Sequence, residues 1–586
     1  MSALCPGKIG TIGIAFRQCD RDKVAIRGEE RVSKPARTGP ASEMSCLYDL
    51  TAANILLPVE DMLSGDVLLL GSVVQSVRGR ASELANSLTC HSRMPSEAEP
   101  LDASPVYDTI VAFDLFTMLD VPGPQGFIPT DDPVLHWLRA ILQSLRSGGR
   151  LVLALENGPV DQRRAYAAQD FSSHSSSRTS AWTQLRQLLE GAGLVHQHWW
   201  FPFPNHREAR TILSEHGLSP NSGLDAGALA GEASDGRRAW RRIAEAGDLA
   251  DRAPAVLVIA SAVTLPADHR LALHIGHERR PEFNKVATIL AQKGGPPVVL
   301  RVPRQPGLTR SAAGITNRFP AEALAPGQPW PETLEEILAC NGWTEADVAT
   351  WAERWITALR AEFLDASPGN LVPEVDTRLP GHAFDAIPRN LLVDGDRATF
   401  IDLEWNLDTP LDFGHLLVRG LVDTFLTTPI TGWPAPEIDP TYLTLLHAAT
   451  APLGVHLSDA AIAERLDREA RFQQVVSGRE TNRDFAWLAS THPASRAQLL
   501  MHARGLTDEV TALQTERSEL INAFEDARAR TDRVIAYAAE RDREVERLEA
   551  ALVRAEASLV MPPPEPLGPA IRLGRAFRGL FPSKRT

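Results

Sequence analysis

Short apolar segments alternate with amphipathic ones from about residue 47 to residue 264. Apolar runs of strand length lie at Val67–Gly71, Tyr107–Leu115, Arg150–Leu155, Gln197–Phe203 and Ala255–Ala262. Segments with helical spacing lie between them at Pro133–Leu145 and Trp182–Leu189, and each is followed by a turn that contains glycines. Continuous apolar strands separated by helices are typical of a parallel sheet covered on both faces. The pattern therefore predicts an α/β domain over residues 46–265, with a long insertion at residues 205–254.

The pattern changes after this region. Phe283–Leu290 and Val298–Val302 have the apolar character of two paired strands. Helical spacing follows at Pro329–Leu338 and Trp351–Phe363, and the chain after Trp405 is mostly helical to about residue 503. Strands followed by a larger helical part indicate an α+β domain over residues 266–500.

A heptad pattern covers residues 505–560. Its positions alternate in steps of four and three at Leu506, Val510, Leu513, Arg517, Leu520, Phe524, Ala527, Thr531, Val534, Ala538, Arg541, Val545, Leu548, Leu552, Ala555 and Leu559. Such a repeat predicts a coiled coil of roughly 80 Å, through which the chain associates with itself. Arg517, Thr531 and Arg541 interrupt the apolar seam and are candidates for fixing its register.

The two ends of the chain are basic. Residues 1–45 are weakly patterned and indicate a poorly ordered arm. Residues 570–586 contain Leu573, Phe577, Leu580 and Phe581 on one helical face, with arginines beside them. A basic amphipathic helix suits an anionic membrane surface, and it would equally suit docking on a partner or on the protein itself.

Composition excludes several classes of protein. The formal charge of −14 argues against nucleic acid as a partner, because phosphate binding needs a concentrated cationic surface. The five cysteines are scattered without metal-type spacing, which indicates a reducing compartment. No apolar run is long enough to span a membrane, and the N-terminus lacks a signal-type apolar core. We therefore expect a cytoplasmic protein, at most peripheral to the inner face of the cell membrane.

The most chemically specific stretch is Phe384–Trp405, which reads F-D-A-I-P-R-N-L-L-V-D-G-D-R-A-T-F-I-D-L-E-W. It predicts a loop, a strand, a tight turn and a return strand. Asp385 and Asn390 would share the loop, with Asp402 at the end of the paired strand. Phosphoryl transfer needs a carboxylate that deprotonates a hydroxyl, together with an amide oxygen and a carboxylate that hold Mg²⁺. An ordinary hairpin with acidic turn residues is the alternative interpretation.

This D-x-x-x-x-N…I-D arrangement resembles the catalytic and metal-binding loops of the protein-kinase-like superfamily, especially its small-molecule kinases. The resemblance implies ATP and Mg²⁺ as cofactors, Asp385 as the base, and Asn390 and Asp402 as metal ligands. Arg301 stands where active kinases carry an ATP-binding lysine, and arginine does not reproduce the compact ammonium group. No glycine-rich phosphate loop is visible, since H-E-R-R-P at residues 277–281 occupies its place.

The order V-L-L-L-G, Y-D-T-I-V-A-F, L-R-S-G-G-R-L-V-L-A-L-E-N and W-W-F-P-F-P resembles class I S-adenosylmethionine-dependent methyltransferases. The resemblance implies a Rossmann-type sheet that ends in an antiparallel strand pair. It also implies a glycine-rich turn after the first strand and an acid after the second. Here Gly71 is the one glycine of that turn, and Leu88–Arg93 supplies no acid. We therefore predict a degenerate cofactor site with very weak or no S-adenosylmethionine binding.

The whole order of domains resembles bacterial proteins that terminate lipopolysaccharide O-antigen chains with a kinase and a methyltransferase. It implies surface-glycan assembly with glycosyltransferases as partners, and phosphate transfer to a glycan hydroxyl. Three alternatives stay open. One is an active glycan methyltransferase with a passive kinase-like domain, another is a non-catalytic coiled-coil scaffold for glycosyltransferases, and the third is a small-molecule kinase unrelated to glycans.

Overall fold

The computed structural model describes most of the chain between residues 53 and 559. The described ranges are 53–71, 75–91, 106–113, 138–139, 141–157, 181–231, 234–364, 372–409, 411–493 and 496–559. The basic arm expected at residues 1–45 and the amphipathic tail expected at residues 570–586 lie outside them. The chain divides into a first unit, Met1–Gln498, and a second unit, Leu499–Thr586.

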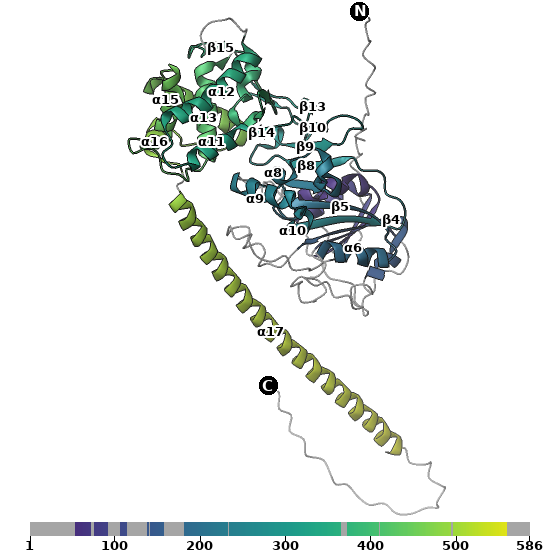
Figure 1. The fold of residues 1–586 in the computed structure, drawn as a ribbon. Helices are drawn as coiled ribbons and strands as arrows, with labels where there is room; N and C mark the ends of the chain where they lie inside the picture. Colours follow the sequence, from purple (N-terminus) through teal and green to yellow (C-terminus); the bar gives the residue numbers. More distant parts are fainter. Residues whose placement is uncertain are drawn as a thin grey trace, which may run out of the picture. The chain divides into compact units, whose positions relative to one another are not determined.

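One sheet of 11 strands runs through the first unit in the order β13-β10-β9-β8-β6-β5-β7-β4-β3-β1-β2 (Figure 1). Its strands are β1 (Asp66–Leu70), β2 (Ser87–His91), β3 (Tyr107–Phe113), β4 (Leu145–Glu156), β5 (His196–Phe203), β6 (Thr211–Ser214), β7 (Ala255–Ser261), β8 (Arg270–Ile275), β9 (Lys285–Leu290), β10 (Val298–Pro303) and β13 (Glu322–Ala323). The sheet therefore continues from the predicted α/β region into the strands that follow residue 265.

The strands up to residue 261 form the expected Rossmann-type sheet. β1 pairs in parallel with β2 and with β3, and β3 pairs in parallel with β4. β7 is antiparallel to its neighbours β4 and β5, so the predicted terminal antiparallel pair is confirmed. The reversal of strand order at β1 and β3 is the arrangement of a doubly wound sheet.

Both faces of this sheet are covered, because successive side chains of a strand point to opposite faces. Leu68 and Leu70 of β1 belong to one hydrophobic core, and Val67 and Leu69 belong to another. The first core includes residues from α6 (Ala181–Gly191), α8 (Ala226–Ala230) and α9 (Ser234–Glu245). The second core includes residues from the 3₁₀ helix η1 (Ala53–Met62) and from α2 (Gln75–Leu84).

One predicted helix is partly wrong. The segment Pro133–Leu145 was expected to be helical, but Leu145 already begins β4 and pairs with Tyr107. The register then shifts so that Thr109 pairs with Arg150, and Gly148 takes a φ of 79° within this irregular stretch. Pairing with β3 therefore overrides the helical spacing at Leu145, and β4 includes the turn at Gly148.

The insertion at residues 205–254 is structured. It contains β6 together with α7 (Glu215–Leu218), α8, α9 and α10 (Leu249–Arg252). β6 pairs antiparallel with β5 on one side and with β8 on the other. β8, β9 and β10 then continue as antiparallel neighbours, which includes the predicted strand pair. The pattern did not predict that the insertion would join the two sets of strands.

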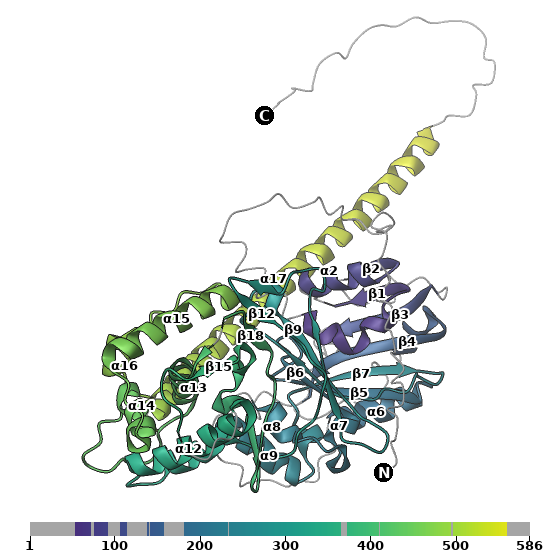
Figure 2. The same cartoon turned by 90° about the horizontal axis from the view of Figure 1, so that it is seen from above.

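The helical part of the first unit lies after residue 329 (Figure 2). Its helices are α11 (Trp330–Ala339), α12 (Glu345–Phe363), α13 (Phe413–Thr427), α14 (Tyr442–Thr450), α15 (Asp459–Ser477) and α16 (Phe485–Ser490). α12 begins before the predicted Trp351, because Thr344 and Asp347 form a reciprocal capping box at its start. Trp351 and Trp355 of α12 are buried in the hydrophobic core that these helices share.

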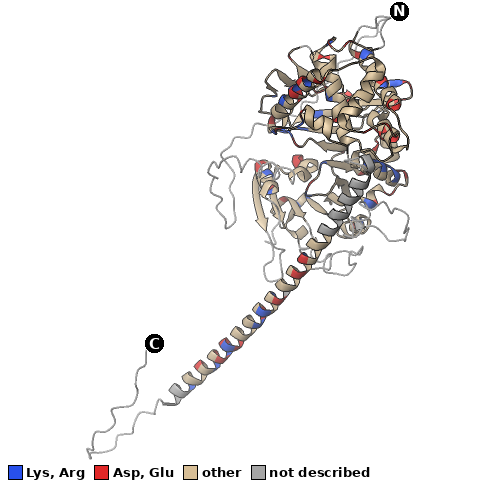
Figure 3. Cartoon of the chain, turned by 90° about the vertical axis from the view of Figure 1, so that its left-hand side faces the viewer, with Lys and Arg blue, Asp and Glu red and all other residues tan. Residues whose placement is uncertain are grey.

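The second unit contains one long helix. α17 (Arg496–Leu559, 64 residues) covers the whole heptad pattern and begins ten residues before it. Charged residues of both signs alternate along the helix (Figure 3). Heptad positions such as Leu513, Phe524 and Val545 are exposed by 56%, 68% and 51%. Among the described residues, no helix is both long and apolar enough to cross a membrane.

Ion pairs join the insertion to the helical part of the first unit. Glu332 of α11 is 4% exposed and accepts hydrogen bonds from Arg241 at 2.5 Å and from Arg237 at 3.4 Å, both on α9. Arg241 also donates to Asp225, which precedes α8. A buried carboxylate is stable as an ion only with such partners, so Glu332 holds the two segments together.

Replacing Glu332 by glutamine should therefore lower stability. The change keeps the shape of the side chain but removes the buried charge that Arg237 and Arg241 share, although Arg241 keeps Asp225 and Arg237 keeps Glu335 as a partner. We expect a loss of about 2 kcal/mol in the free energy of unfolding, below the full value for a buried pair because the arginines are partly exposed. Urea unfolding measures this loss. Glu336→Gln, on the exposed side of α11, should change stability little, and equal effects of the two variants would contradict the assigned role.

Candidate functional site

The predicted hairpin is present. The loop before it forms two 3₁₀ turns, η4 (Gly381–Asp385) and η5 (Pro388–Asn390), followed by β16 (Leu391–Asp394) and β17 (Arg397–Phe400). Gly395 makes the tight turn with a φ of 56°, which favours glycine. The backbone N–H of Ile401 donates to the carbonyl of Asn390 at 2.8 Å. This bond places the loop beside the end of the return strand, where Asp402 follows.

Asn390 is held in a defined orientation. Its Nδ2 donates to the backbone carbonyl of Asp385 at 2.8 Å, and the side chain is buried. With the amide nitrogen used in this way, Oδ1 is the atom that can serve as a ligand. The two predicted loop residues are therefore in direct contact.

Asp385 is 3% exposed and faces Arg419 of α13, whose Nη2 lies 3.4 Å from Oδ1. Arg419 packs over the rings of Phe384 and Phe472, and its Nη1 donates to Glu469 at 2.6 Å. Burial raises the pKa of Asp385 to about 6, although the charge of Arg419 opposes this. The carboxylate is thus a stronger base than an exposed aspartate and still ionised at neutral pH.

Asp402 lies two residues beyond β17 rather than at the end of the strand, and it has a φ of 54°. Nζ of Lys285 lies 2.7 Å from Oδ1 and 2.9 Å from Oδ2, and Nε of Arg301 lies 2.7 Å from Oδ1. Burial alone would raise the pKa of Asp402, but the charges of Lys285 and Arg301 outweigh it and lower the pKa. Asp402 is therefore an anion that two cations hold in place.

Arg301 is not placed as a simple phosphate contact. Its side chain is 5% exposed, and it pairs with Asp402 and Glu322 and donates to the carbonyl of Pro320 at 3.2 Å. All of these partners are oxygen atoms of the protein. In this conformation, Arg301 orients the predicted metal ligand Asp402.

Sequence reasoning missed Lys285, which comes from β9. Its side chain is 7% exposed and reaches both Asp402 and Glu404, the latter at 2.8 Å. Glu404 is 1% exposed and also pairs with Arg279 at 2.6 Å. One signal could have found Lys285: with Lys293, it is one of only two lysines between residues 35 and 583 in a chain that otherwise uses arginine. A lysine in such a chain indicates a position where a compact ammonium group is needed.

The predicted metal ligands offer oxygen atoms, which are the ligands that magnesium prefers. Asn390 offers an amide oxygen and Asp402 a carboxylate, and Mg²⁺ in nucleotide sites takes few protein oxygens beside water and phosphate. Within the described ranges, no group of three or more histidine, cysteine, aspartate or glutamate side chains forms a metal-binding cluster.

The residue predicted for the S-adenosylmethionine site, Gly71, directly follows β1. It takes a φ of 110°, and its N–H donates to the carbonyl of His91 at 2.9 Å. That backbone conformation requires glycine. Residues 72–74 and 92–105, where the rest of the glycine turn and the ribose acid were sought, lie outside the described residues.

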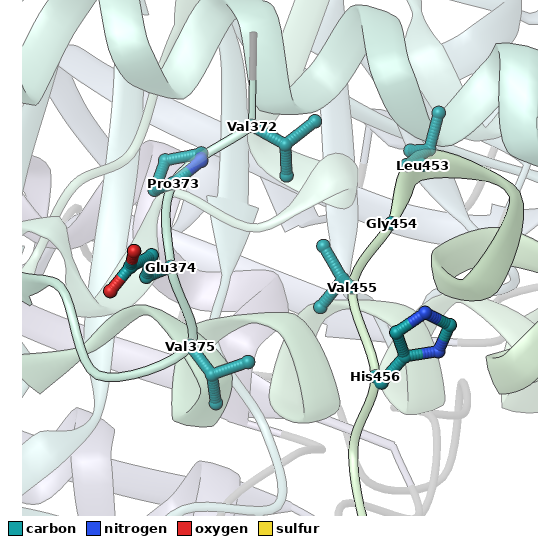
Figure 4. Close-up of a pocket in the computed structure, with 8 residues that line it drawn as sticks. All are labelled: Val372, Pro373, Glu374, Val375, Leu453, Gly454, Val455 and His456. Atoms are coloured by element: carbon teal, nitrogen blue, oxygen red, sulfur yellow. The ribbon is translucent and has the colours of Figure 1, made fainter. Parts of the chain in front are cut away.

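A cavity of about 500 Å³ lies elsewhere in the helical part (Figure 4). It is lined by Val372–Val375 and by Leu453–His456. Glu374 and His456 are its titratable groups, and none of the predicted site residues lines it. This cavity is therefore separate from the loop and turn that carry Asp385, Asn390 and Asp402.

No protein-family model matches the sequence, and no curated protein matches it. Among solved structures, a methyltransferase from Archaeoglobus fulgidus is similar at 12% identity and a TM-score of 0.22, over 36% of this chain and 93% of that one. A phosphoethanolamine N-methyltransferase from Haemonchus contortus is 12% identical, with a TM-score of 0.20, over 36% of this chain and 53% of that one. A methyltransferase from Thermotoga maritima is 12% identical, with a TM-score of 0.20, over 38% and 95%. TM-scores of this size do not establish a shared fold, so the Rossmann-type assignment rests on the strand order.

Proposed function

We propose that the chain transfers a phosphoryl group from Mg²⁺-ATP to a hydroxyl group of a surface glycan. One observation carries this proposal: Lys285 and Arg301, from two neighbouring strands, converge on Asp402 beside the loop that holds Asp385 and Asn390. This arrangement supports a common site for the three predicted residues and the two cations. Phosphoryl transfer depends on this combination, because it is catalysed mainly by positioning and by electrostatic stabilisation.

Asp385 would take the proton of the acceptor hydroxyl. Its burial makes it more basic than an exposed aspartate, and Arg419 holds one of its oxygens in a fixed direction. A base with a pKa close to the working pH accepts a proton most effectively. The contact of Asn390 with the Asp385 carbonyl would keep the base beside the metal ligands.

The cations around Asp402 would change partners when a nucleotide binds. Asp402 and Asn390 would hold Mg²⁺, which neutralises the charge of the transferring phosphate. Lys285, now paired with Asp402 and Glu404, has the ammonium geometry that suits phosphate oxygens. Arg301 keeps Glu322 as a second partner and would continue to orient Asp402.

The glycan acceptor follows from the resemblance of the domain order to O-antigen chain-terminating proteins. In that setting the chain would work with surface-glycan glycosyltransferases in the cytoplasm, at the inner face of the membrane. The basic residues within residues 570–586 support contact with anionic lipid at that surface.

Methyl transfer is the second candidate function. The parallel order β2-β1-β3-β4 favours it, because ligands of a doubly wound sheet bind where the strand order reverses. Gly71 lies at the carboxyl end of β1, which is this reversal point. The loss of the other expected glycines and of the ribose acid still favours a retained fold with a degenerate cofactor site.

Self-association through α17 is the third part of the proposal. Its apolar heptad positions are exposed along one chain, and a second α17 would bury them. Such pairing would place two copies of the phosphotransferase site in one assembly.

The kinase proposal predicts different effects for two similar substitutions. Asp402→Asn should abolish the Mg²⁺-dependent stabilisation by ATP, because it removes the charge of the metal ligand. Asp385→Asn should leave this stabilisation intact and reduce ATP turnover by about 10²–10⁴-fold, because a base acts on the acceptor. Thermal-shift titration with ATP, with and without EDTA, measures binding, and phosphate release or transfer measures turnover.

Asp396→Asn is the matched control, since this exposed aspartate lies at the turn of the same hairpin. It should bind ATP and turn it over like the wild type. A wild-type protein without any Mg²⁺-dependent shift at millimolar ATP would refute the kinase proposal and favour the scaffold alternative.

We predict that S-adenosylmethionine binds very weakly or not at all. The glycine turn and the acid that hold the ribose are missing from the sequence, so few contacts with the cofactor remain. Isothermal titration with S-adenosylmethionine and S-adenosylhomocysteine tests this. Micromolar binding would contradict the degenerate-site prediction and make methyl transfer the leading function.

The double substitution Leu520→Glu and Leu548→Glu should dissociate the assembly, because it places charges in the apolar seam. Light scattering should then report the mass of a single chain. Ser518→Glu with Ala550→Glu adds the same charge away from the seam and should leave the mass unchanged. If the seam variant keeps the wild-type mass, α17 does not mediate self-association.

A further inference from the structure

A second cavity, of about 350 Å³, lies where the insertion meets the shared sheet. Its polar lining comes from Arg210 just before β6 and Thr211 at its start, from His274 of β8 with His277 just after that strand, and from Arg237 of α9. Phe203 and residues 228–231 supply its apolar wall. A volume of this size is that of a small-molecule site.

The position of this cavity follows from the register of the sheet. Phe203 pairs with Thr211, Thr211 with His274, His274 with Ala287, and Ala287 with Arg301. Cross-strand partners lie on the same face of a sheet, so these residues form one row. The neighbouring row, Phe201, Leu213, Ala272, Ile289 and Val299, belongs to the hydrophobic core. The sheet face thus changes from apolar to polar toward the cavity.

The cavity lies on the same face of the sheet as Arg301, which pairs with Asp402. His274 and Arg301 are separated by two strand spacings, which is roughly 10 Å. β4, β5 and β8 run parallel to one another. β7 lies between β4 and β5, β6 lies between β5 and β8, and each of these two strands is antiparallel to both of its neighbours. The cavity therefore lies at the carboxyl edge, where sheets of this kind bind ligands.

The cavity has a positive lining. None of the described residues that line it is acidic, and of its two arginines Arg237 already pairs with Glu332, so Arg210 is the cation that gives the lining its charge. His274 lines the cavity, and Oγ1 of Thr211 lies 3.0 Å from its Nδ1. Desolvation, together with the charges of Lys285 and His277, lowers the pKa of His274 to about 4, so at neutral pH the ring is uncharged and offers a ligand a neutral N–H donor. The contact with Thr211 fixes the ring and leaves Nε2 to meet a ligand.

We propose that this cavity binds a phosphate-bearing small molecule, with Arg210, His274 and His277 around the phosphate group. Arginine and histidine are donors that suit phosphate oxygens, and the hydroxyl of Thr211 adds a polar contact. The ring of Phe203 and the apolar segment at residues 228–231 would cover the less polar part of the ligand. This site is distinct from the one that Asp385, Asn390 and Asp402 form, and the inference does not depend on kinase activity.

The test is isothermal titration of the full chain with glucose 1-phosphate and with inorganic phosphate, each in the absence of Mg²⁺. We expect the sugar phosphate to bind, and we expect Arg210→Gln with His277→Gln to weaken it by tenfold or more, since charge-assisted hydrogen bonds are lost. Arg207→Gln removes the same charge at an exposed position of the same segment and should not change binding. Circular dichroism and thermal melting show whether each variant is folded.

Two further measurements separate this site from the nucleotide site. The Asp402→Asn variant should keep its affinity for the sugar phosphate, and the Arg210→Gln, His277→Gln variant should keep its Mg²⁺-ATP shift. If ATP displaces the sugar phosphate competitively, the cavity belongs to the nucleotide site and the proposal is wrong. It is equally wrong if Arg207→Gln weakens binding as much as the double variant. A wild-type protein that binds the sugar phosphate but not ATP would refute the kinase proposal and leave the cavity proposal standing.

Discussion

The pairing of β6 with β8 is the contact on which the rest of the first unit depends. It joins a Rossmann-type sheet to the antiparallel strands that carry Lys285 and Arg301. Because backbone hydrogen bonds cross this boundary, the strands on either side cannot tilt independently. A movement that closes the predicted phosphotransferase site would therefore have to come from the helical part. A chain cut between β7 and β8 would leave two unpaired strand edges, and exposed edges promote aggregation.

Charge balance constrains the region around Asp402. Asp402, Glu404 and Glu322 are close to Lys285, Arg301 and Arg279, so three anions meet three cations. Buried charges are tolerated when each is paired, and removing one group leaves its partner unpaired. This coupling explains why Arg301, whose place suggested a phosphate contact, is instead a partner of the protein's own carboxylates. The phosphates of a bound nucleotide are anions, so they would replace some of the protein's carboxylates as partners of these cations.

Much of the fold was predictable because apolar runs directly report buried strands. β1, β3, β5 and β7 were found in this way, as was the hairpin with its Asp394–Asp396 turn. β6 was missed because a strand of four residues inside a long insertion has too little pattern of its own. Asp385, Asn390 and Asp402 could be predicted as one set because their spacing in the sequence is local. Lys285 and Arg419 were missed because they reach the site from distant strands and helices, and no local spacing records that contact.

Asp402 has a left-handed backbone, with a φ of 54°. Aspartate and asparagine tolerate this conformation better than other residues with a side chain, because their short polar groups can bond locally. Alanine at this position would add backbone strain to the loss of the carboxylate, and the two losses would be indistinguishable in an activity measurement. An alanine scan would therefore overstate the chemical contribution of Asp402. Glycine would avoid the strain but would make the backbone of the turn more flexible. The isosteric change to asparagine is the substitution that separates charge from backbone geometry here.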